Sequence, residues 1–104
     1  MIDVLTLEKF EAHVGETFRT KLAGGRVLDF ILESASPLTD RAVAAGAGDA
    51  DRRAPFSLVF LGPEGIALPQ ATYLLAHEAL GRLDIFVVPV EQTGNRLLYE
   101  AIFT

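Results

Sequence analysis

No cysteine occurs among the 104 residues, so disulfides, thiolate metal sites and cysteine nucleophiles are excluded. Cationic side chains are scarce: nine Lys and Arg stand against fourteen Asp and Glu, for a formal net charge of −5. Nucleic-acid surfaces need clustered cations, so nucleic acid is not an expected partner. No apolar run approaches the roughly 20 residues that a membrane-spanning helix needs. Residues 1–4 lack the basic and then apolar layout of a signal peptide, so we expect a cytoplasmic protein.

The chain has the length of one domain, and half of its residues are hydrophobic, which argues against intrinsic disorder. We therefore expect residues 1–104 to form a single small β domain. Its first element is a short helix, because Leu7, Phe10 and Val14 recur at helical spacing. Thr6 stands at the N-cap position before this stripe, and Gly15 stands where the helix would end.

Hydrophobicity then alternates with period two, which is typical of half-buried strands. Strands are predicted over residues 16–22, 26–34, 55–61, 71–77, 82–90 and 96–103, with turns rich in Gly between hairpin neighbours, among them Gly24-Gly25 and Gly94-Asn95. The pattern predicts a mainly all-β fold, a small antiparallel six-stranded barrel or sandwich whose N-terminal helix plugs one end. The predicted core consists of Phe18, Leu22, Leu28, Phe30, Leu32, Phe56, Leu58, Phe60, Tyr99 and Phe103.

Residues 36–54 have a different character, because they are rich in Ala, Gly and Asp and show little periodicity. We predict a long flexible loop over this range. Loops of this length are either functional or tolerated insertions, and the composition is compatible with both.

No catalytic, cofactor-binding or metal-binding residues are predicted. His77 and Glu78 begin like the zinc-protease helix motif, but Gly81 occupies the position of the second histidine ligand. His13 is the only other histidine, so two isolated histidines without a metal are expected. No serine lies in a nucleophile elbow. Carboxylates could pair across strands, for example Asp84 with Glu100, but any acidic sheet offers such pairs. An enzyme is therefore the least expected class.

Some strands are apolar on the face that should meet water. The outward set is predicted to be Val59, Leu61, Phe86, Val88, Leu98 and Ile102. Either both faces are internal, or these side chains form an interface with another protein, since large apolar patches on monomers mark interfaces. Pro89 cannot donate to a sheet ladder, which places it at an edge strand or a bulge.

These features favour a non-enzymatic structural or interaction module that associates with itself or with an assembly partner, through the apolar sheet face or the edge strand. The alternative is a β-barrel that binds a small ligand.

The chain also resembles a small bacterial domain family of unknown function. The resemblance rests on residues 5–10, 14–18, 54–60, 68–70, 86–90 and 99–103, with Tyr73, His77, Leu80 and Gly81. It spans nearly the whole chain and is weakest over residues 36–54. The resemblance implies genes that often lie near phage-tail-collar-like genes, and so an assembly or accessory role, and it names no chemistry.

Overall fold

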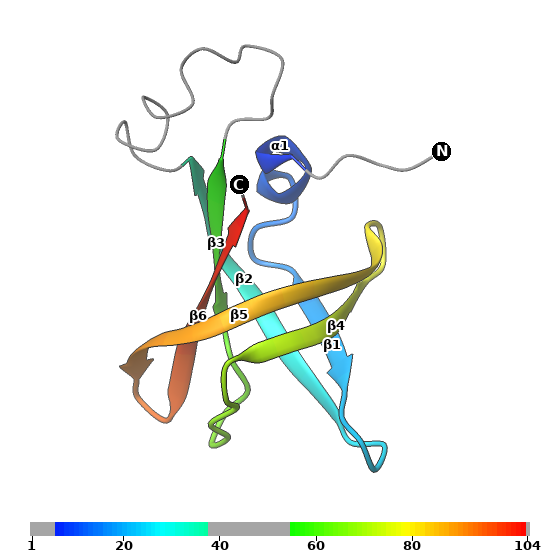
Figure 1. The fold of residues 1–104 in the computed structure, drawn as a ribbon, viewed down its shortest axis with the longest axis vertical. Coiled ribbons are helices and arrows are strands. Elements are labelled where there is room, and N and C mark those ends of the chain that lie inside the picture. The colour runs from blue at the N-terminus through cyan, green and yellow to red at the C-terminus, as the bar shows by residue number, and fades with distance from the viewer. Residues whose placement is uncertain (1–5, 38–54, 104) are drawn as a thin grey trace.

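The computed structural model describes residues 6–37 and 55–103, which form one short helix and six strands. The elements are α1 (Leu7–Glu11), β1 (Thr17–Lys21), β2 (Val27–Pro37), β3 (Phe56–Leu61), β4 (Ala71–His77), β5 (Gly81–Thr93) and β6 (Arg96–Phe103). All paired strands are antiparallel and close into a barrel in the order β1-β2-β3-β6-β5-β4 (Figure 1). The predicted all-β fold is confirmed, and of its two forms the chain adopts the barrel. Residues 38–54 of the predicted loop lie outside the described residues.

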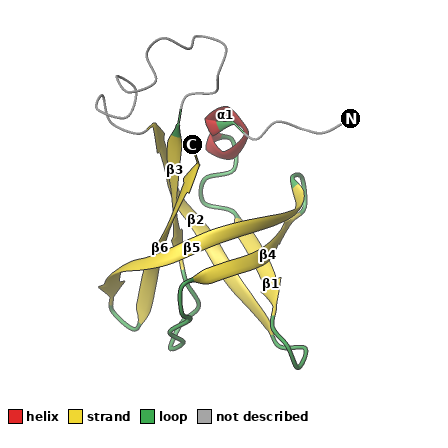
Figure 2. Cartoon of the chain, in the orientation of Figure 1, coloured by secondary structure: helices red, strands yellow, loops and turns green. Residues whose placement is uncertain are grey.

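Helix α1 covers one end of the barrel, beside the beginning of β3 and the last part of β6 (Figures 1 and 2). The Phe10 side chain is fully buried there, with its ring 5.9 Å from that of Phe56 and 5.6 Å from that of Phe103. The helix is shorter than its apolar stripe predicts, and Val14 is 44% exposed. Thr6 holds the N-cap position but makes no capping hydrogen bond with its side chain. Within the described residues, no helix is long and apolar enough to cross a membrane.

The interior is filled by inward-facing side chains of the alternating strands. Eight of the ten predicted core residues are buried, whereas Leu22 and Phe103 are partly buried and pack against that core. Among residues 6–37 and 55–103, the remaining buried hydrophobic residues are Phe10, Leu68, Leu75, Ile85, Val87 and Ala101. Aromatic rings dominate the centre, where Phe30 lies 6.2 Å from Phe60 and 5.3 Å from Tyr99 between ring centroids. A small barrel packed in this way has side chains where a larger one has a ligand cavity.

Tyr99 fixes the connection between β3 and β4 to the core. Its hydroxyl accepts a hydrogen bond from the Leu68 backbone N–H at 2.7 Å and donates one to the Leu68 carbonyl oxygen at 3.0 Å. Desolvation by burial raises the pKa of the Tyr99 hydroxyl, so it stays protonated and able to donate. The connecting segment is thereby held without a regular strand of its own.

Two strands run beyond their predicted ends. Strand β2 continues to Pro37, because its ladder with β3 resumes after a bulge between Leu32 and Ser34. The predicted start of the loop at residue 36 is therefore wrong. Strand β5 continues to Thr93, past a bulge between Pro89 and Glu91.

Pro89 lies at a bulge, which was one of its two predicted placements, and not on an edge strand. Strand β5 has a neighbour on each side in the closed barrel, so the expected exposed edge strand is wrong. Proline is accommodated because the ladder with β4 ends at Val87, which leaves Pro89 paired only with Tyr99 of β6.

Candidate functional site

The outer surface of β3, β6 and β5 carries the six residues that alternation assigned to an interface. Phe86 and Ile102 are 52% and 51% exposed. The other four, Val59, Leu61, Val88 and Leu98, are partly exposed. None of the six is buried within the described chain, so the outward orientation is as predicted.

Strand register arranges these six side chains around Glu100, and we call them the apolar ring. Val59 and Val88 are the cross-strand partners of Glu100 on either side. Leu98 and Ile102 lie two residues before and after it on β6. Leu61 and Phe86 take two of its four diagonal positions, and Ser57 and Glu91 take the other two. Glu100 is partly exposed, and among the described residues its side chain has no hydrogen bond or ion pair. Glu100 is therefore an unpaired carboxylate whose nearest neighbours along and across the strands are apolar.

The rim of the apolar ring is hollowed and acidic. A shallow hollow of about 440 Å³ adjoins it, lined by Glu33, Ser34, Val59, Leu61, Thr93 and Leu98. Glu91 is the exposed partner of Leu98 on β5, and Asp84 is exposed two residues before Phe86 on the same strand. This face combines apolar side chains with carboxylates at its centre and its edge.

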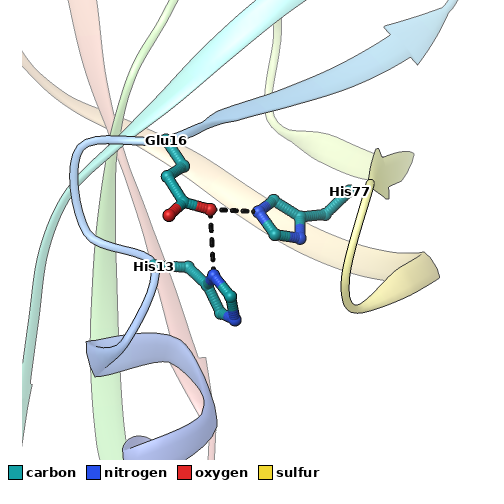
Figure 3. A group of neighbouring side chains, drawn as sticks. All are labelled: His13, Glu16 and His77. Atoms are coloured by element: carbon teal, nitrogen blue, oxygen red, sulfur yellow. Dashed lines mark hydrogen bonds and ion pairs between the residues drawn. The ribbon is translucent and has the colours of Figure 1, made fainter.

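A second candidate site joins His13, Glu16 and His77, and it contradicts the expectation of two isolated histidines (Figure 3). The Glu16 Oε1 atom lies 2.7 Å from His77 Nε2 and 2.9 Å from His13 Nδ1. The imidazole rings are 4.5 Å apart in an edge-on arrangement. We call these three residues the histidine–carboxylate cluster.

The cluster is assembled where α1 leads into β1. Gly15 adopts a φ of 91°, which favours glycine, and its N–H bonds to the Leu32 carbonyl oxygen at 2.7 Å. That turn places Glu16 beside His77, the last residue of β4. The His77 side chain is only 4% exposed and its ring lies 4.6 Å from that of Phe18.

Hydrogen bonds at the β4–β5 turn determine the tautomer of His77. Its Nδ1 atom accepts from the backbone N–H groups of Ala79 at 3.0 Å and Leu80 at 3.1 Å. Because Nδ1 holds a lone pair toward these donors, the ring proton is on Nε2, which donates to Glu16. The hydrogen bond from His77, followed by that from His13, lowers the pKa of the Glu16 carboxyl.

The donor set does not fit a metal ion as it stands. A neutral imidazole has one lone pair, and in His77 the two N–H groups of the turn occupy it. If Nε2 coordinated a metal ion, the ring proton would have to lie on Nδ1, where it would point at the two backbone N–H groups. In metal sites, by contrast, the histidine nitrogen that does not bind the metal donates its N–H to an acceptor. Tyr73 is not part of the cluster, and its hydroxyl donates to the Pro69 carbonyl oxygen at 2.6 Å.

The cluster lies at the seam where β1 meets β4. The β1–β4 ladder contains one register pair, Arg19 with Ala76, whereas the other ladders contain five to seven. The hydrogen bond between His77, the last residue of β4, and Glu16, the residue before β1, lies beside this short ladder. We infer that the cluster reinforces barrel closure.

Glu16→Gln is expected to lower stability at neutral pH and to weaken its acid dependence. A carboxyl whose pKa is lowered in the folded state adds stability above its unfolded pKa, and this is lost as the pH falls through the folded pKa. Urea unfolding at neutral pH and through the acid range below the ordinary glutamate pKa measures the effect. Glu11→Gln on α1 is the control. Parallel acid dependences for wild type and Glu16→Gln would contradict the role.

Comparison with known proteins places the chain in a family. A family model described as a domain of unknown function, DUF6916, matches residues 5–103, and the chain belongs to that family. No curated protein and no solved structure gives a significant match.

Proposed function

We propose that this member of the DUF6916 family is a non-enzymatic association module whose apolar ring binds a different protein. The main observation in support is that six apolar side chains from three adjacent strands lie together on the outside of a closed barrel. Contiguous apolar surface of this kind marks protein interfaces. The packed aromatic interior supports association over the alternative of a ligand held inside the barrel.

A different protein is favoured over a second copy by the charge of the face. A two-fold contact centred on the ring would place one Glu100 against the other, with like charges removed from water. The resemblance to bacterial domains encoded near phage-tail-collar-like genes favours a component of a protein assembly, met in the cytoplasm.

Replacing Phe86 and Ile102 together by Glu is expected to weaken partner binding about a hundredfold or more. Each loses apolar burial of order 1.5–3 kcal/mol at the interface, and each adds a desolvated charge. A photoreactive amino acid at position 86 would capture the partner in the native host. The partner would then be identified, purified and titrated calorimetrically against wild type and variant.

Val27→Glu is the matched control, because Val27 is 54% exposed on β2 and lies outside the apolar ring. It should leave the affinity unchanged, and all variants should show wild-type circular dichroism. Equal affinities for wild type and the double variant would contradict the proposal. So would a wild-type dimer, found by light scattering, that the double variant abolishes.

A further inference from the structure

The residue at the centre of the apolar ring indicates which kind of side chain the partner presents to it. This inference rests on the proposed association. Glu100 is enclosed by Val59 and Val88 across the strands and by Leu98 and Ile102 along β6. Any apolar surface laid over the ring removes this carboxylate from water. An unpaired buried charge is strongly unfavourable. A partner that offers no cation or hydrogen-bond donor to Glu100 would therefore bind more weakly.

We propose that the partner presents a Lys or Arg within an apolar segment, and that this cation pairs with Glu100 while its neighbours cover the apolar ring. A charge-assisted hydrogen bond would then satisfy the carboxylate in the dry centre of the contact. Truncating one member of such a pair weakens binding far more than removing a rim charge. Glu100 is therefore the specificity-determining residue of the face.

The rim supports a basic partner independently of the centre. Glu33, Glu91 and Asp84 are exposed around the apolar ring, whereas Arg96, two residues before Leu98, is partly exposed and donates its Nε–H to the Gly62 carbonyl oxygen. The chain carries a net charge of −5. A negative face steers a basic segment toward it and raises its association rate. The hollow of about 440 Å³ beside Val59 and Leu61 offers a position for one apolar side chain of that segment.

The same charges disfavour a lipid surface as the occupant. Anionic headgroups attract basic segments, whereas this face presents carboxylates at its centre and its rim. A protein segment is therefore the occupant that fits both the apolar and the charged parts of the surface.

A random peptide library displayed on phage tests this chemistry directly and does not require that the partner be identified. Selection would use the wild-type protein, with counterselection on the variant carrying Phe86→Glu and Ile102→Glu. We expect the enriched peptides to carry a Lys or Arg flanked by apolar residues. Their dissociation constants should rise about tenfold for Glu100→Gln, which removes the charge from the centre of the contact. They should rise about a hundredfold for Glu100→Lys, which places a cation opposite the cation of the peptide.

The outcomes separate this inference from the proposed function. Enriched peptides that lack a basic residue, or that bind Glu100→Gln as tightly as wild type, would overturn the charge pairing and leave association through the apolar ring intact. A library with no peptide that distinguishes wild type from the double variant would overturn both. Binding to phosphatidylserine vesicles that the double variant abolishes would also overturn both, because it would assign the face to lipid.

Discussion

Phe60→Ala is expected to lower the free energy of unfolding by about 3–5 kcal/mol, a large part of the stability of a domain of this size. Phe60 is fully buried at the middle of the barrel. Its ring centroid lies 5.4 Å from that of Phe18 and 6.2 Å from that of Phe30, in edge-on contacts. Removal of the ring leaves a cavity between strands whose closed ladders resist collapse. Urea unfolding followed by circular dichroism measures the loss.

Val59→Ala is the control for this prediction, because Val59 precedes Phe60 on β3 and points outward. It should cost well under half as much, since a partly exposed valine loses little burial on truncation. A loss below about 1 kcal/mol for Phe60→Ala would show that the core collapses onto the vacated space.

Strand positions were predictable because each strand has one face in the barrel and alternates accordingly. In β3 the residues Phe56, Leu58 and Phe60 are buried and the residues between them are not. The hairpin glycines Gly24, Gly25 and Gly94 adopt positive φ, which is the conformation that their turn sequences indicate. Strand alternation and turn glycines depend on residues that are close together along the chain, so they can be predicted from one sequence.

Features that depend on distant contacts were missed. Glu16 and His77 are 61 residues apart, and barrel closure alone brings them together. Helix α1 ends at Glu11 because the chain must turn at Gly15 to bond with Leu32, a constraint that its apolar stripe does not contain. The extension of β2 follows from pairing with β3 across a bulge, which alternation before residue 34 does not reveal.

The candidate interface lies between these two cases. Alternation predicted that the six members of the apolar ring point outward, which is a local property. Their grouping around Glu100 depends on the register of β6 with β3 and β5, including the bulge after Pro89. A shift of one residue would turn the carboxylate into the core. The central position of this charge among side chains of three strands is therefore visible only in the folded barrel.

Gly62→Ala is expected to destabilise the fold by about 1–3 kcal/mol or more, through overpacking. A Cβ at this position would overlap the ring of Tyr99 at Cε1 and lie 3.1 Å from the Leu97 carbonyl oxygen. Tyr99 is fully buried, with its hydroxyl bonded to Leu68, so its ring cannot withdraw. The backbone is held as well, because the Gly62 N–H donates to the Leu97 carbonyl oxygen at 2.8 Å.

A double-mutant cycle with Tyr99→Leu isolates the cause. Tyr99→Leu alone is destabilising, because it removes the ring and leaves the Leu68 backbone groups without partners. It also vacates the space that the new Cβ needs, so Gly62→Ala should cost much less in the Tyr99→Leu background than in wild type. Equal costs in both backgrounds, measured by urea unfolding, would contradict the steric explanation. A cost that vanishes with the ring would show that Gly62 is required because the β3 end approaches Tyr99 too closely for any side chain.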